Sequence, residues 1–121
     1  MTTPVLIADT DEPTRELLKK TLGNKYPLVI VESPSHALKI TSEKRKPRLA
    51  LIGINQSVNG EGENIFAAIR KQEPEMTVIA LGERNTEKET IEAVRMGASG
   101  YMIKPLNPHE IISIAEKNSR N

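Results

Sequence analysis

Two kinds of segment alternate along this chain from end to end, and that order leaves few folds open. Five short apolar runs, most of them containing β-branched residues, are typical of strands buried on both faces. Between them, apolar residues recur three and four positions apart, as they do on one face of a helix. The runs are 5–8, 28–31, 49–52, 78–81 and 101–103, and the helical spacing is clear at 18–22, 65–69, 91–94 and 111–115.

Five units of strand then helix predict an α/β fold with a doubly wound, five-stranded parallel sheet. Right-handed crossovers place helices on both faces of such a sheet. The chain has 121 residues, whereas an eight-stranded barrel typically needs about 250. We therefore expect a single domain over residues 1–121.

Capping residues indicate where several helices begin and end. Polar residues suited to the N-cap precede four of the helical segments, and two of the four are followed directly by proline. Thr86 and Glu89 also have the spacing of a capping box. The expected N-caps are Asp11, Ser33, Thr86 and Asn107, and Gly23 and Gly97 are expected as left-handed C-caps.

Composition excludes several classes of protein. The chain has no cysteine, so disulfides and thiolate metal sites are ruled out. The net charge is +1 and the only basic cluster is Lys44–Lys46 with Arg48, which argues against a nucleic-acid surface. No apolar stretch is long enough for a membrane span, and we expect a cytoplasmic protein. His36 and His109 fall on different predicted helices, so we expect no histidine metal site.

Polar residues and glycines follow the predicted strands. Because the carboxyl ends of parallel strands meet at one edge of a sheet, these residues should border a common crevice. Asp9 and Lys104 are expected to form an ion pair there, although an acidic cluster could also hold Mg²⁺. The residues in question are Asp9, Thr10 and Asp11 after the first run, Gly53 and Asn55 after the third, Gly82 after the fourth, and Lys104 after the fifth.

Three stretches make the chain resemble the receiver domain of bacterial two-component response regulators. "VLIADTDEPTRELLKKTL" is similar to the family's first strand, acidic pair and first helix, and "KPRLALIGINQSVNGEGENIFAAIR" to its phosphorylation loop region. "GASGYMIKPL" follows the family from the fourth helix to its Lys-Pro dipeptide. The resemblance implies a flavodoxin-like fold with strand order 2-1-3-4-5 and a cis peptide bond between Lys104 and Pro105.

The same resemblance shows where the chain departs from the family. The family's acidic pair falls on Asp9 and Thr10, its phosphoacceptor aspartate on Gly53, and its Thr or Ser hydroxyl residue on Gly82. Lys104 keeps the family's lysine, Tyr101 its aromatic residue, and Asn55 the position whose carbonyl meets the metal. Aspartyl phosphorylation needs a carboxylate nucleophile, which glycine lacks. We infer a site that is dead for this reaction and binds neither metal nor cofactor.

Two interpretations remain open for each unusual residue. Gly53 and Gly82 either allow a close approach by a neighbouring backbone or ligand or mark positions freed from catalytic demand. With no hydroxyl at Gly82 there should be extra room beside Tyr101, whose ring either sits inward permanently or moves freely. Asp11 is expected to act as a helix cap rather than as a ligand.

The favoured function is a pseudo-receiver that binds proteins without being phosphorylated and catalyses no reaction. Its protein partner, or a second copy, would bind the face made by the fourth helix, fifth strand and fifth helix. One alternative is a small-ligand-binding or catalytic domain that reuses the crevice; another is a receiver phosphorylated at a different acid, such as Asp9 or Glu61. The expected face includes Arg84, Arg95, Met96, Tyr101 and Ile103.

Overall fold

A five-stranded parallel sheet forms the centre of the computed structural model, which describes residues 4–32, 37, 47–54 and 61–118. The strand order is β2-β1-β3-β4-β5, and every pairing is parallel, so the predicted topology is confirmed. The strands are β1 (Val5–Ala8), β2 (Leu28–Val31), β3 (Leu49–Gly53), β4 (Thr77–Gly82) and β5 (Gly100–Ile103).

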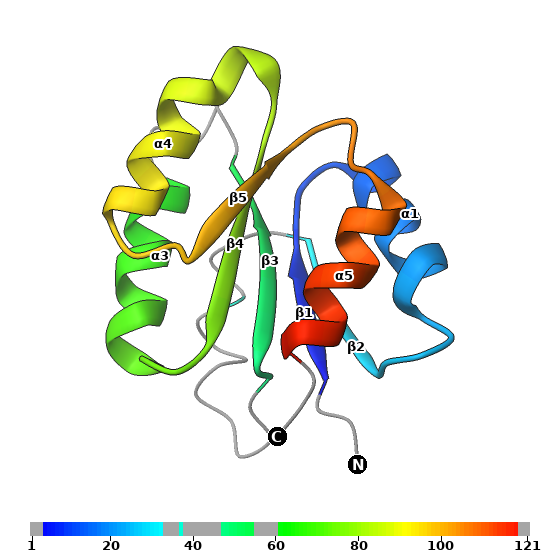
Figure 1. The fold of residues 1–121 in the computed structure, drawn as a ribbon. Helices are drawn as coiled ribbons and strands as arrows, with labels where there is room; N and C mark the ends of the chain where they lie inside the picture. Colours follow the sequence, from blue (N-terminus) through cyan, green and yellow to red (C-terminus); the bar gives the residue numbers. More distant parts are fainter. Residues whose placement is uncertain (1–3, 33–36, 38–46, 55–60, 119–121) are drawn as a thin grey trace.

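Helices cover both faces of this sheet (Figure 1). Successive strand residues point to opposite faces, so Leu6 and Ala8 join one core, while Val5 and Ile7 join the other. The first core lies under α3 and α4, and the second lies under α1 and α5. The helical elements are α1 (Glu12–Leu22), α3 (Glu61–Gln72), the 3₁₀ turn η2 (Arg84–Thr86), α4 (Glu87–Arg95) and α5 (Pro108–Asn118).

Two predicted N-caps and one C-cap are confirmed. Asp11 Oδ2 accepts a hydrogen bond from Thr14 N at 3.2 Å at the start of α1. Asn107 Oδ1 accepts from His109 N at 2.8 Å and from Glu110 N at 3.4 Å at the start of α5. Gly97, after α4, has a φ of 135°, a conformation that favours glycine. Ser33 lies outside the described residues, as do His36 and Lys44–Lys46.

One other capping prediction is wrong, and another holds only in position. Gly23 keeps a right-handed φ of −60°, and its N–H donates to Lys19 O, so α1 ends without a left-handed residue. Thr86 stands at the N-cap position of α4, as predicted, but its side chain makes no capping hydrogen bond to that helix. The Thr86 hydroxyl bonds back to Glu83 instead, accepting from its N–H at 2.7 Å and donating to its carbonyl at 3.0 Å.

Arg70 fixes the segment that leads into β5. Its Nε donates to Gly97 O at 3.0 Å and one terminal nitrogen donates to Ser99 Oγ at 2.8 Å. Ser99 Oγ in turn accepts from Val78 N on β4 at 3.1 Å. The end of α3 is thereby tied to the chain just before Tyr101. None of the helices in the described part of the chain has the length and apolar character needed to cross a bilayer.

Candidate functional site

A buried ion pair lies at the edge where the carboxyl ends of β1, β3, β4 and β5 meet, at the top of Figure 1. Lys104 Nζ is 3.0 Å from Asp9 Oδ2 and 3.3 Å from Asp9 Oδ1. The Asp9 and Lys104 side chains are only 3% and 14% exposed. The expected pairing between the first and fifth strand ends is therefore present. Because the pair is buried, loss of either side chain would leave the other as an uncompensated buried charge.

Backbone contacts hold the two members of this pair in place. Asp9 Oδ1 accepts from Asp11 N at 2.8 Å, and the Asp9 carbonyl accepts from the Arg15 guanidinium at 2.8 Å. Asp9 Oδ2 makes no well-aligned hydrogen bond among the described residues, so the ammonium neutralises it as an ion pair. Lys104 N donates to Gly82 O at 2.8 Å, and the Lys104–Pro105 peptide bond is cis, as the resemblance implied.

Asp11 serves mainly as the cap of α1. Besides Thr14 N, its Oδ2 accepts from the Thr14 hydroxyl at 2.5 Å, and Lys104 Nζ lies 4.0 Å away. The hydrogen bond from the Thr14 side chain lowers the pKa of Asp11 below its ordinary value of 3.8; burial opposes this, and Lys104 adds to it. Asp11 is therefore ionised near neutral pH, as its capping role requires.

The carboxylate of Asp9 lies in the space that a side chain at Gly53 would need. A Cβ atom on Gly53 would overlap Asp9 Oδ2 and stand 2.5 Å from Asp9 Cγ. The close neighbour is thus a side chain, not the backbone or ligand that one of the two interpretations expected, and both interpretations of Gly53 stay open. Residue 53 also ends a strand that is buried throughout its length.

Thr90 of α4 fills the corresponding space above Gly82. A Cβ atom on Gly82 would overlap Thr90 Oγ1 and lie 3.2 Å from Thr90 Cβ. Thr90 is fully buried, and its hydroxyl donates to Thr86 O at 2.8 Å. The extra room expected beside Tyr101 is thus absent, and so is the inward ring, because Tyr101 is 51% exposed.

Sequence reasoning missed Thr90, although its position carried a signal. Thr86, Thr90 and Ala93 are buried at spacings of four and three residues, which is the helical stripe that faces a sheet. Because two of the three are threonines, the stripe is not apolar, and apolar periodicity does not mark it. Asn55 lies outside the described residues, and Thr10 is exposed.

The donor set does not fit the Mg²⁺ ion that the resemblance associates with this edge. Mg²⁺ is held in proteins by one or two carboxylates within an octahedral oxygen shell. Here the buried carboxylate already faces an ammonium at 3.0 Å, and Gly53 offers no ligand. Among the described residues, no three acidic or histidine side chains gather around a common point, and His109 is exposed at the start of α5.

The residues expected on the interaction face are brought together only in part. Tyr101 and Ile103 lie two residues apart on β5, an edge strand beside α4, and so share one face of that strand. Arg95 and Met96 lie at the end of α4. Arg84 belongs to η2, at the opposite end of α4, and borders a cavity of about 600 Å³ instead. Ile91 of α4, which the sequence analysis did not select, is 49% exposed.

Comparison with known proteins gives a consistent result. The family model of the response regulator receiver domain matches residues 5–116. An NtrX-like response regulator of Rickettsia felis is 30% identical over 114 residues, covering 93% of this chain and 24% of the relative. The regulatory protein AruR of Pseudomonas aeruginosa is 31% identical, over 93% of this chain and 47% of the relative. The chain thus spans about a quarter of the length of its NtrX-like relatives.

Solved structures agree in fold. The receiver domain of NtrX from Brucella abortus superposes with a TM-score of 0.82 at 24% identity, covering 94% of this chain and 96% of that one. The chemotaxis protein CheY4 of Vibrio cholerae gives a TM-score of 0.81 at 21% identity, over 98% of this chain and 99% of that one. The flavodoxin-like architecture expected from the sequence is therefore shown.

Proposed function

Because this chain belongs to the family of response regulator receiver domains, we propose that it is a pseudo-receiver that binds proteins without being phosphorylated. The observation that carries the proposal is Gly53, which stands where the family resemblance expects the phosphoacceptor aspartate. A glycine supplies no nucleophile for phosphoryl transfer. The domain would catalyse no reaction and would need no metal or cofactor.

The packing around Gly53 and Gly82 supports this function. The Asp9 carboxylate occupies the space above Gly53, and vacating it would separate a buried carboxylate from Lys104. Gly82 carries no hydroxyl that could move toward a phosphoryl group, and the Thr90 hydroxyl that occupies the space above it donates to Thr86 O at 2.8 Å. In the family, phosphorylation reaches the aromatic switch residue, here Tyr101, through the phosphoacceptor aspartate and the Thr or Ser hydroxyl. This chain has glycine at both of those positions, Gly53 and Gly82, so Tyr101 would not respond to phosphorylation in that way.

The face formed by α4, β5 and α5 is the proposed binding surface. Tyr101 is 51% exposed and Ile91 49% exposed, the highest exposures of large apolar side chains among the described residues. Exposed aromatic residues are frequent anchors of protein interfaces. The partner, or a second copy of the chain, would contact Arg95, Met96, Tyr101 and Ile103, with Arg84 outside the centre of the contact. Similarity to response regulators supports a role in two-component-type signalling in the cytoplasm.

Site-specific photocrosslinking in living cells tests the binding surface. A photoreactive phenylalanine analogue replaces Tyr101 in one strain and Glu16, an exposed residue of α1 outside the proposed surface, in a matched strain. We expect a discrete crosslinked product, with another protein or with a second copy, from position 101 only. When the crosslinking is repeated in lysate, the yield of this product should be the same with and without a phosphodonor and Mg²⁺. Equal products from both positions, or a product that depends on the phosphodonor, would contradict the proposal.

A further inference from the structure

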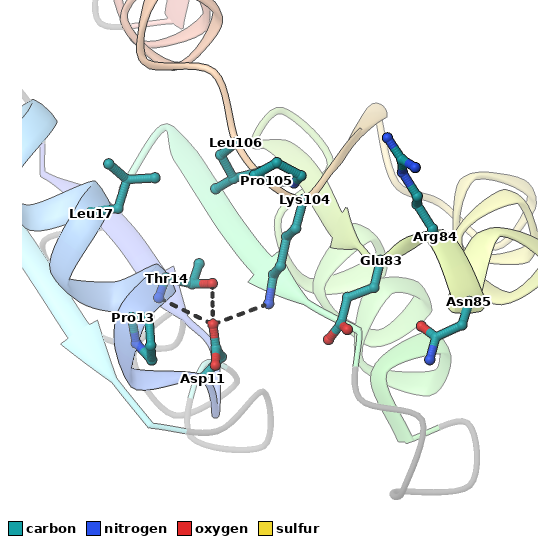
Figure 2. A pocket seen from close by; sticks show the side chains of 10 residues that line it. All are labelled: Asp11, Pro13, Thr14, Leu17, Glu83, Arg84, Asn85, Lys104, Pro105 and Leu106. Atoms are coloured by element: carbon teal, nitrogen blue, oxygen red, sulfur yellow. Dashed lines mark hydrogen bonds and ion pairs between the residues drawn. The ribbon is translucent and has the colours of Figure 1, made fainter.

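A cavity of about 600 Å³ opens between α1 and the segments that follow β4 and β5 (Figure 2). Ligand sites in proteins typically measure about 300–1,000 Å³ and combine an apolar lining with a few polar groups. This cavity has both parts, and the pseudo-receiver function uses neither. We propose that it binds a small organic cation, an ammonium group carried on an apolar chain or ring.

The apolar part of the lining would hold the body of the ligand. Leu17 comes from the middle of α1, and Pro105 and Leu106 come from the segment after β5. Figure 2 shows these side chains on the same side of the cavity. Leu106 is 7% exposed and packs into the core beneath. An alkyl or aryl group lying on this surface would gain about 25 cal/mol for each Å² of apolar area removed from water.

The charged part of the lining leaves the Glu83 carboxylate without an ion pair among the described residues. Glu83 and Asp11 supply two carboxylates. Lys104 is engaged by Asp9 at 3.0 Å and stands 4.0 Å from Asp11.

Besides the Thr14 hydrogen bond, the charges of Lys104 and Arg15 help to lower the pKa of Asp11, so Glu83 is the carboxylate left for a ligand. Arg84 and Glu83 leave the backbone in opposite directions in Figure 2, so the guanidinium of Arg84 points away from both carboxylates. Arg15 donates to the carbonyl of Asp9 and does not line the cavity. A ligand that brings one positive charge and an apolar body therefore complements the site, whereas an anion would meet Glu83 and Asp11.

Titration of the ¹⁵N-labelled protein with n-hexylammonium, followed by amide chemical shifts, tests the proposal. Sodium hexanoate and hexanol, at matched ionic strength, serve as probes with the same chain and a different head group. We expect saturable shifts at Leu17, Arg84 and Leu106 with hexylammonium, weaker binding of hexanol and none of hexanoate. Equal affinity for hexanol or hexanoate, shifts confined to other residues, or no saturable binding would overturn the proposal.

A pair of matched variants separates the cavity from general charge attraction. Glu83→Gln removes one exposed carboxylate of the lining, and Glu16→Gln removes one exposed carboxylate of α1 outside it. Loss of one exposed charge pair should weaken hexylammonium binding by about two- to fivefold in Glu83→Gln. Glu16→Gln should bind as the unchanged protein does. Equal effects of the two substitutions, or no effect of Glu83→Gln, would overturn the proposal.

Discussion

Replacing Gly82 with alanine should destabilise the protein through Thr90, and replacing Thr90 as well should recover much of the loss. The new methyl group would overlap Thr90 Oγ1 and stand 3.2 Å and 3.3 Å from its Cβ and Cγ2. Thr90 is fully buried, so its side chain has no solvent to turn into. Overpacking of this kind costs about 1–3 kcal/mol.

The second substitution removes the atoms that the new methyl group meets. Thr90→Ala alone forfeits the hydrogen bond to Thr86 O, worth about 0.5–1.5 kcal/mol, and leaves a small void. In the double variant the methyl group introduced at position 82 occupies that void. We therefore expect the two substitutions to couple favourably, with the double variant at least about 1 kcal/mol more stable than the sum of the single losses predicts.

Equilibrium unfolding in urea, followed by circular dichroism, measures the four free energies of this cycle. Gly100→Ala is the matched control, because a Cβ atom on Gly100 meets only Ile79 Cδ1, at an ordinary distance of 3.5 Å. It should change the free energy of unfolding by less than about 1 kcal/mol. Additive effects within about 0.5 kcal/mol, or a Gly82→Ala variant as stable as Gly100→Ala, would refute the proposed packing of α4 on β4.

Three further predictions concern the strand ends. Lys104→Met leaves the buried Asp9 carboxylate without its cation and should lower the free energy of unfolding by about 3–5 kcal/mol; a loss below about 1 kcal/mol would contradict the ion pair. Asp11→Ala should lower the free energy of unfolding by about 0.5–2 kcal/mol near neutral pH. Since the folded pKa of Asp11 lies below 3.8, this loss should shrink as the pH falls through that pKa. A loss that grows in acid would contradict the capping role. Titration calorimetry should detect no Mg²⁺ binding at millimolar concentration. Thr10→Asp with Gly53→Asp should acquire some, because it adds two carboxylates and the side chain at 53 must displace the Asp9 carboxylate from its place above Gly53. Binding by the unchanged protein would show that Lys104 does not exclude the ion.

The sheet was predictable because its strands are buried on both faces, so continuous apolar runs mark them. The strand bounds differ from the prediction by a residue at several ends: β3 extends to Gly53, β4 runs from Thr77 to Gly82, and β5 begins at Gly100. Backbone pairing continues past the last apolar side chain, which an apolar pattern does not record. The cap at Asp11 was predictable from local chemistry. The position of Thr86 in front of α4 was predictable too, but the bonding of its hydroxyl to Glu83 was not, because the turn η2 leaves no apolar signature.

The ion pair between Asp9 and Lys104 was predictable because opposite charges follow β1 and β5, whose carboxyl ends lie at the same edge of the sheet. The partners of the two glycines were not. Thr90 meets Gly82 only because α4 crosses β4 at that point, and the angle at which a helix crosses a sheet depends on the packing of the whole core. The same holds for Asp9 above Gly53, since either aspartate of the first loop could have turned toward β3. Sequence therefore identified the unusual positions, and tertiary packing determined what fills them.

Intact-mass spectrometry after incubation with phosphoramidate and Mg²⁺ tests phosphorylation independence most directly. A receiver domain that keeps an aspartate at the position of Gly53, incubated in the same tube, provides the positive control. We predict that the control gains the mass of one phosphoryl group while this protein keeps its original mass at every time point. A gain of one phosphoryl group on this protein, stable or transient, would show that another of its acids accepts phosphate and would contradict the proposed function.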